Sequence, residues 1–285
     1  MRQVYVNGRY LPEGEATVSV FDRGFLFADA VYEVTAVLDG KLVDFAGHLA
    51  RLRRSLKELG MALELSDEEL LAIHRELVRL NGIDEGLIYL QITRGNAGDR
   101  DFLFPDPATP KTVVLFTQKK KLLDSPLAAR GQRIVTVEDL RWRRCDIKTV
   151  QLLYPSMIKE LAKKQGADDA WMVRDGLVTE GSSNNAYIVT AEGAIVTRDL
   201  SSDILHGITR KAVLDCAADL EMTVEERPFT VEEAKAAKEA FSTSASGFVN
   251  PVVEIDGATI GSGKPGPVAA RLRQIYLEKS RAAAI

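Results

Sequence analysis

Apolar and polar residues near the start of the chain follow the pattern of short strands joined by tight turns. Residues 2–7 alternate, and Asn7-Gly8 is typical of a two-residue hairpin turn. A second hairpin is predicted over residues 31–45, with its turn at Asp39-Gly40. These signals predict that the chain opens with β-structure.

Two amphipathic helices are predicted after the second hairpin. Each places its large apolar side chains on one face, which is the spacing of a helix that packs on a core. The second helix opens with a capping box from Ser66 to Glu69. The apolar faces consist of Leu49, Leu52, Leu56 and Leu59 in the first helix, and of Leu70, Ile73, Leu77 and Leu80 in the second.

Further strands are predicted at 87–93 and 112–117, on either side of a polar loop from Gly95 to Pro110. That loop is long enough to be functional rather than a mere connection. After Pro126, short helices and strands resume, with strands predicted at 133–138, 169–174, 185–190 and 239–243.

The Lys-rich, Pro-containing stretch 118–126 is the natural domain boundary. We therefore expect a small α/β domain at 1–118, an interdomain linker at 119–126 and a larger mixed domain at 127–285, in the α+β fold class. A site in the crevice between two domains is the default expectation for such a chain.

Composition narrows the classes of function. The 285 residues carry a net charge of −4 without a basic face, so a nucleic-acid partner has little electrostatic support. No apolar signal core or membrane-spanning stretch is visible, so we expect a cytoplasmic protein with no membrane partner. Cys145 and Cys216 form no CxxC pair, and the histidines share no metal-ligand spacing. Neither a disulfide framework nor a metal site is expected.

Residues 141–148, RWRRCDIK, place a lysine close to three arginines. Like charges lower the pKa of a lysine when they stay near it, and only the neutral amine attacks a carbonyl group. Lys148 is therefore a candidate Schiff-base lysine, although composition alone favours a basic surface strand.

A second block, residues 179–185, puts the acid Glu180 beside four small hydrogen-bonding side chains, immediately before the strand 186–189. An acid placed in this way can keep a ring nitrogen protonated while its neighbours organise the surroundings. Taken alone, the block also fits an ordinary polar turn.

Two segments are candidates for binding phosphate. Residues 205–210, LHGITR, precede an amphipathic helix, and a glycine followed by free N–H groups at a helix start is an anion site. Residues 242–247, STSASG, end a strand and are rich in small donors. The stretch 261–266 lacks the P-loop spacing and is predicted to be a turn before the last helix. A lysine, an acid and two phosphate cradles together match the groups of pyridoxal phosphate.

These motifs, in this order, resemble those of the class IV, fold type IV aminotransferases, and most closely the bacterial D-amino-acid aminotransferases. The resemblance implies a small α/β domain and a larger domain with a barrel-like sheet. It also implies a homodimer that binds pyridoxal 5′-phosphate between the domains. It covers essentially the whole chain, through residues 21–24, 27–33, 48–52, 92–95, 141–148, 179–187, 205–210 and 253–257.

The resemblance assigns roles to the candidate residues. Lys148 resembles the lysine that carries the cofactor and moves a proton between the substrate Cα and the cofactor C4′. Glu180 resembles the carboxylate that keeps the pyridine nitrogen protonated. Tyr32 resembles an active-site tyrosine, supported by the polar side chains of Glu33 and Arg141.

The cofactor's phosphate has its own set of implied partners. Arg51 resembles the arginine that grips it, and Leu205 the residue that packs on the ring face. For Arg51, an exposed position on an arginine-rich helix is the alternative; Tyr32 also fits a half-buried strand aromatic, and His48 fits a structural histidine better than a catalyst. The implied backbone donors are those of Ile208, Thr209, Ser244 and Ala245.

One loop departs from the pattern. Bacterial D-amino-acid aminotransferases carry an Arg-x-His pair after this strand, which helps to hold the substrate carboxylate. Here Arg100 is followed by Asp101 and Phe102, so the expected histidine is missing. A single arginine can still orient a carboxylate, and we expect Arg100 and Tyr32 to bind the substrate.

The implied reaction is ping-pong transfer of the amino group of a D-amino acid to a 2-oxo acid such as 2-oxoglutarate or pyruvate. Residues 243–248 depart from the branched-chain L-amino-acid branch, which also has no obvious counterpart of Arg100. That branch remains the first alternative, followed by aminodeoxychorismate lyase and an (R)-selective amine transaminase.

Overall fold

The computed structural model describes residues 1–285, which form two compact units. The first unit contains Met1–Lys121, Ile147–Gln151 and Ala283–Ile285, and the second contains Leu122–Asp146 and Leu152–Ala282. The division after Lys121 falls within the stretch expected to be a linker. The segment that carries Lys148 belongs to the first unit, although it lies far along the chain. The domain limits 1–118, 119–126 and 127–285 stay a prediction.

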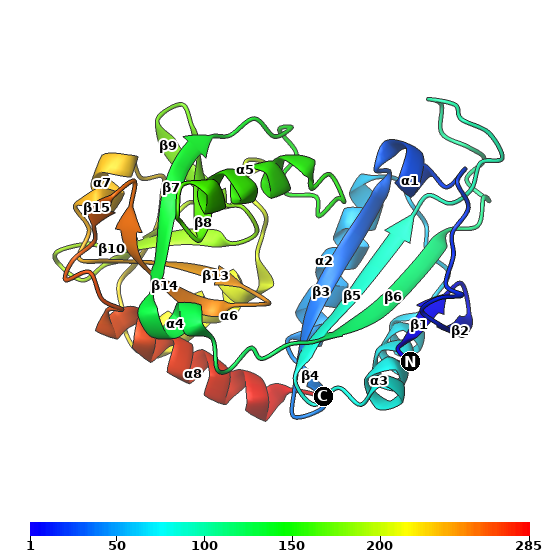
Figure 1. The fold of residues 1–285 in the computed structure, drawn as a ribbon, viewed down its shortest axis with the longest axis horizontal. Helices are drawn as coiled ribbons and strands as arrows, with labels where there is room; N and C mark the ends of the chain where they lie inside the picture. The colour runs from blue at the N-terminus through cyan, green and yellow to red at the C-terminus, as the bar shows by residue number, and fades with distance from the viewer. The chain divides into compact units, whose positions relative to one another are not determined.

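The first unit is built on a six-stranded antiparallel sheet with the order β2-β1-β6-β5-β3-β4. Figure 1 shows its three long strands, β3, β5 and β6, running next to one another. The elements of this unit are β1 (Gln3–Val6), β2 (Arg9–Pro12), α1 (Arg23–Phe27), β3 (Ala30–Leu38), β4 (Lys41–Leu42), α2 (Phe45–Glu58), α3 (Asp67–Asn81), β5 (Gly86–Thr93) and β6 (Thr112–Lys119).

Both predicted hairpin turns are confirmed. Asn7 and Gly8 have φ of 46° and 88°, and Asp39 and Gly40 have φ of 53° and 72°. Two consecutive positive φ values define the turn whose twist matches the flanking strands. The second hairpin is shorter than predicted, because α2 already begins at Phe45, whose ring packs into the core.

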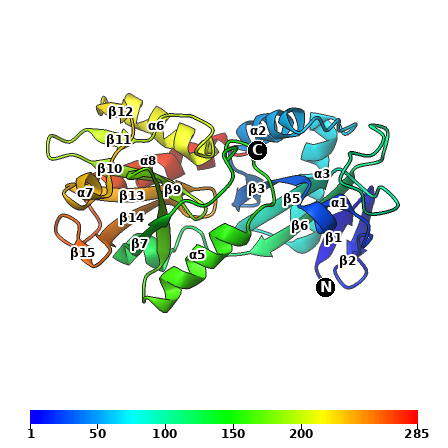
Figure 2. The ribbon, with the colours of Figure 1, turned by 90° about the horizontal axis from the view of Figure 1, so that it is seen from above.

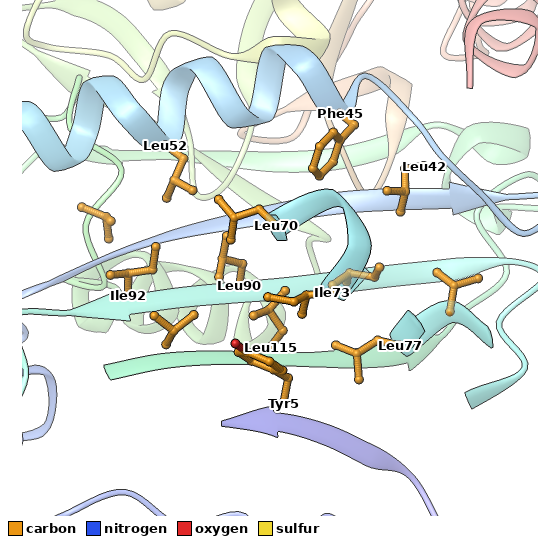
Figure 3. Packing of buried hydrophobic residues seen from close by; sticks show 14 of the residues in the cluster. Tyr5, Leu42, Phe45, Leu52, Leu70, Ile73, Leu77, Leu90, Ile92 and Leu115 are labelled. Carbon is orange, nitrogen blue, oxygen red and sulfur yellow. The ribbon is translucent and has the colours of Figure 1, made fainter. Parts of the chain in front are cut away.

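Helices α2 and α3 lie over one face of this sheet (Figure 2), where their apolar faces meet the strands. The capping box of α3 is present, with Ser66 accepting from the Glu69 N–H. Figure 3 shows Leu52 of α2 and Leu70 of α3 directed towards Leu90 of β5. The helical periodicity of the sequence therefore predicted most of the buried face, but Leu80, near the end of α3, was predicted to point inward and is 37% exposed.

The second unit is built on a nine-stranded mixed sheet with the order β12-β11-β10-β13-β14-β7-β8-β9, and β15 pairs with β14. Strand β9, at the end of this order, returns beside β10, so the sheet curls into the expected barrel-like form. Its elements are α4 (Pro126–Arg130), β7 (Gln132–Glu138), α5 (Leu153–Lys164), β8 (Asp169–Arg174), β9 (Leu177–Gly181), β10 (Asn185–Val189), β11 (Ile195–Thr197), α6 (Ile208–Asp219), β12 (Val224–Glu226), α7 (Val231–Lys235), β13 (Glu239–Ser244), β14 (Phe248–Ile255), β15 (Ala258–Thr259) and α8 (Pro267–Ala283).

Two of the local predictions for this unit are confirmed. Gly207 is the N-cap of α6, and 261–266 precedes α8 as a turn-rich segment. Residues 141–148 differ from expectation, since they follow β7 as a loop without strand structure. No helix of the chain combines the length and apolar character that crossing a membrane requires.

Candidate active site

Lys148 is held by its backbone against β3 and α2 of the first unit. The N–H of Tyr32 donates to the Lys148 carbonyl at 3.0 Å, and Val31 forms an isolated bridge with Thr149. The Lys148 N–H donates to Ser55 Oγ at 3.3 Å. A residue remote in sequence is thereby attached to the edge of the first unit's sheet, where its backbone position is fixed.

The Lys148 amine lies 4.2 Å from the centre of the Tyr32 ring and makes no hydrogen bond or ion pair. An aromatic face accepts a cation but offers no strong acceptor for a proton. Two of the three arginines that precede Lys148 in the sequence, Arg141 and Arg144, are paired with carboxylates. The structure does bring Lys148 and Tyr32 together, as the resemblance implied.

Glu33, Arg51 and His48 form a buried cluster beneath this region of the first unit. Arg51 binds both carboxylate oxygens of Glu33, with Nε at 2.8 Å from Oε1 and Nη2 at 2.7 Å from Oε2. His48 Nδ1 lies 2.8 Å from Glu33 Oε2. All three residues are buried, so the exposed alternative for Arg51 is wrong.

Charge compensation decides the ionisation of Glu33. Burial alone would raise the pKa of Glu33, but the charge and hydrogen bonds of Arg51, with the hydrogen bond of His48, hold it at about 2. Glu33 is therefore an anion at neutral pH. It fixes the orientation of the Arg51 guanidinium by a bidentate contact, the most directional form of this ion pair.

Arg100 lies on the exposed loop between β5 and β6. Its guanidinium rests 5.0 Å from the ring centres of both Phe27 and Phe102. Asp101 does not pair with it, because Asp101 Oδ1 accepts from the Leu103 N–H at 3.0 Å. The structure gives Arg100 no contact with Tyr32 or Lys148, so its role in binding substrate stays a prediction.

Glu180, on β9, is the central acid of the second unit. It is 4% exposed, yet each oxygen has a donor: Arg141 Nη1 at 2.6 Å from Oε1, and Asn185 Nδ2 at 3.0 Å and the Leu205 N–H at 3.1 Å from Oε2. Burial raises the pKa of Glu180, while Arg141 opposes the rise. The three donors orient the carboxylate, which must stay ionised to accept a hydrogen bond from a protonated ring nitrogen.

Arg141 is itself fixed by a series of alternating charges. It binds Asp139 through Nε at 2.9 Å and Nη2 at 2.8 Å. Asp139 contacts Arg174 at 3.3 Å, and Arg174 binds Asp203 at 2.5 Å. Asp203 continues to Arg198 at 3.1 Å. Sequence analysis identified Arg141 but none of the groups that hold it.

Asn185, on β10, brings the two predicted phosphate segments together. It pairs with Thr243 at the end of β13, and its Nδ2 donates to the Leu205 carbonyl at 3.0 Å. A side chain on Gly207 would place its Cβ 2.1 Å from Asn185 Oδ1, so it would displace the Asn185 amide from its bonds to Glu180 and Leu205. Asn185 was visible in the sequence as one of several small polar residues, without a signal that set it apart.

Backbone donors without partners occur at both segments. The N–H groups of Ile208 and Thr209 begin α6, whose N-cap supplies no side-chain acceptor. In the turn after β13, the N–H groups of Ala245 and Ser246 also have no acceptor. Free donors at a helix start and in a turn are what an anion binds.

Residues 30–255 match the family described as amino-transferase class IV. The chain belongs to this family. Enzymes of the class use pyridoxal 5′-phosphate, and the chain is a transaminase that depends on this cofactor.

Curated relatives extend the match over nearly the full length. The chain is 41% identical over 276 residues to the D-alanine aminotransferase of Staphylococcus aureus strain N315, which covers 96% of each chain. It is 40% identical to that of Bacillus licheniformis, covering 95% of this chain and 94% of the relative.

Solved structures agree on the fold. The branched-chain aminotransferase of Thermoproteus uzoniensis with norvaline has a TM-score of 0.84 and 29% identity, covering 97% of this chain and 94% of that one. The holo-form branched-chain amino acid aminotransferase of Thermobaculum terrenum has a TM-score of 0.85 and 24% identity, covering 99% and 94%. These likenesses establish fold type IV.

The polar groups of the second unit fit the cofactor. A carboxylate can accept about four hydrogen bonds, and Glu180 receives three, which leaves an acceptor position for a ring N–H. The partnerless N–H groups at α6 and after β13 suit a phosphate. In the first unit, Lys148 has an amine without a competing hydrogen bond. The chain therefore offers an acceptor for the ring nitrogen, donors for the phosphate and an amine for the aldehyde of the cofactor.

We predict that Glu33→Gln destabilises the protein at neutral pH by about 3–5 kcal/mol, because Arg51 is left as a buried charge without its partner. The folded-state pKa of Glu33 is about 2, below the ordinary 4.5. Its contribution is therefore present above pH 4.5 and is lost as the pH falls towards 2. Urea denaturation at several pH values should show the difference between the two proteins shrinking below about pH 4.5.

Glu76→Gln is the matched control, since Glu76 pairs with Arg79 on the exposed surface of α3. Exposed pairs of this kind stabilise little, so this variant should unfold like the wild type. A constant difference for Glu33→Gln across the pH range would contradict the ionised state of Glu33.

Proposed function

We propose that this protein transfers the amino group of a D-amino acid to a 2-oxo acid by ping-pong transamination. The observation that carries the proposal is the 41% identity to D-alanine aminotransferases across 96% of both chains. The branched-chain enzymes share the fold at lower identity, 29% and 24%. Fold alone does not choose between them, because it is common to both branches.

Pyridoxal phosphate, when bound, supplies an electron-withdrawing ring that accepts the electron pair released when a proton leaves the substrate Cα. Lys148 would carry the cofactor, and its amine would take that proton. Glu180 holds a proton at the ring nitrogen, and Arg141 keeps the Glu180 carboxylate in place. Leu205 would pack on the ring, and its N–H donates to Glu180.

The N–H groups at the start of α6 and after β13 would hold the phosphate, and Arg51 is the side chain proposed to bind it as well. Gly207 permits the close approach of α6 to Asn185, which also bonds Glu180. The Asn185 side chain therefore sets the spacing between Glu180 and the backbone N–H groups at the start of α6. This spacing is a property of the second unit alone.

Tyr32 and Arg100 are the proposed substrate-binding groups. The Tyr32 ring lies beside the Lys148 amine, where it can limit the approach of water and orient the substrate. The Arg100 guanidinium lies 5.0 Å from the centres of two phenylalanine rings and makes no side-chain hydrogen bond, so its N–H groups are open for a carboxylate. Phe102, in place of a second polar group, favours apolar side chains on the substrate.

A homodimer is also proposed. Helix α5 carries three apolar side chains at intervals of four residues, and Leu153, Met157 and Leu161 are 76%, 58% and 41% exposed. A continuous exposed apolar stripe marks a surface that a partner covers. A second copy of the chain is the proposed partner, and a cytoplasmic location remains the expectation from the sequence.

The purified enzyme, mixed without an acceptor with D-alanine, D-glutamate or L-leucine, should lose the visible absorbance of its bound cofactor only with the D-amino acids. Stopped-flow spectroscopy measures this half-reaction directly. Lys148→Ala should show neither the absorbance nor the conversion. Conversion by L-leucine alone would assign the protein to the branched-chain branch, and conversion by none would favour the lyase or an amine substrate.

Arg100→Ala should raise KM for D-glutamate by about tenfold or more, because a charge-assisted hydrogen bond contributes about 1.5–3 kcal/mol. For a simple amine without a carboxylate, KM should change little. Steady-state kinetics with both substrates tests the assignment, and Arg9→Ala, on the exposed β2, is the control. Equal changes for the two substrates would remove Arg100 from the site.

Light scattering should give twice the mass of one chain for the wild type and the mass of one chain for Met157→Glu, which places a charge in the apolar stripe. Lys163→Glu changes an exposed charge on the same helix and should remain dimeric. A wild type of single-chain mass would refute the dimer, and a dimeric Met157→Glu would exclude α5 from its interface.

A further inference from the structure

Arg273, on α8, places a cation among backbone carbonyls and no carboxylates. Its Nη1 donates to the carbonyls of Gly247 at 2.7 Å and Val249 at 3.0 Å. Its Nη2 donates to those of Leu122 at 3.0 Å and Leu123 at 3.3 Å. No Asp or Glu side chain pairs with it, in contrast to Arg51 and the arginines around Glu180. Its positive charge is therefore not neutralised by the protein.

The turn that Arg273 holds is strained. Ser244 to Gly247 form a turn closed by a 3.3 Å bond from the Gly247 N–H to the Ser244 carbonyl, and Phe248 follows with a φ of 59°. This left-handed position in a hairpin usually takes glycine, and a bulky residue occupies it only when its surroundings enforce the conformation. Here Phe248 is fully buried against Tyr276, with ring centres 5.6 Å apart.

The contacts of Arg273 explain how the strain is maintained. Two of its four carbonyl acceptors belong to Gly247 and Val249, the residues immediately before and after Phe248. One guanidinium thus bonds the peptide group that precedes the strained residue and the carbonyl of the residue that follows it. The same turn contains the partnerless N–H groups of Ala245 and Ser246.

We propose that Arg273 is a positioning residue for the phosphate of the cofactor: it holds the turn 244–247 in its anion-binding conformation and adds an uncompensated positive charge behind it. The inference rests on the proposed function, because that function supplies the phosphate. Arg273 does not need to touch the ligand. It acts through the turn and through its charge.

The test compares binding of pyridoxal 5′-phosphate with binding of pyridoxal, which lacks the phosphate, to the full-length protein freed of cofactor. Arg273→Met should weaken binding of the phosphorylated form by about tenfold or more, the effect expected for losing one favourable charge interaction. Binding of pyridoxal should change by less than about threefold. Arg271→Met is the control, since Arg271 lies on the same helix and bonds only Gln274.

Arg273→Lys keeps the charge but cannot bond four carbonyls at once, so its loss should be intermediate. It also provides the test if the methionine variant fails to fold. Equal weakening of both ligands, or no weakening of either, would overturn the role of Arg273 while leaving the proposed function intact. A wild type that binds neither ligand would overturn both.

Discussion

A carboxylate that is removed from water must be matched by donors, and the polar interior of the second unit is arranged around this requirement at Glu180. Desolvation of an unpaired carboxylate costs several kcal/mol. Three donors meet Glu180, and the strongest, Arg141, is itself matched by Asp139. The alternation of positive and negative side chains continues from Asp139 through Arg174 to Asp203. Glu180 is therefore both buried and fixed in direction, which is what an acid needs to hold a proton at a ring nitrogen.

The first unit also matches a buried carboxylate with hydrogen-bond donors, and it does so with fewer residues. Glu33 and Arg51 form a buried bidentate pair, with His48 as a third member. The two units differ in how the protein compensates the arginine that each is proposed to contribute, Arg51 as a partner of the phosphate and Arg273 as a support of the phosphate-binding turn. Arg51 is paired with a carboxylate, whereas Arg273 hydrogen-bonds only to carbonyl oxygens. An anion bound near the turn after β13 therefore meets a charge that the protein has left uncompensated.

Much of the local structure was predictable because it depends on neighbours in the sequence. The turn at Asn7-Gly8 needs two positive φ values that these residue types adopt readily, and the capping box of α3 links Ser66 to Glu69 within one turn. The periodicity of α2 and α3 predicted the face that packs on the sheet. The misjudged loop 141–148 lacks such a local pattern, and its Arg141 pairs with the nearby Asp139 and with Glu180, which lies far along the chain.

The sequence by itself determined the family, the order of the motifs and the chemical identity of Lys148 and Glu180, since reactive groups are properties of single side chains. Only the tertiary structure decided that Lys148 lies against Tyr32, that Asn185 joins the acid to the phosphate segments, and that Arg273 clamps a strained turn. These contacts join residues that are far apart along the chain. Neither spacing nor periodicity encodes such contacts, because they arise when strands pair and helices pack.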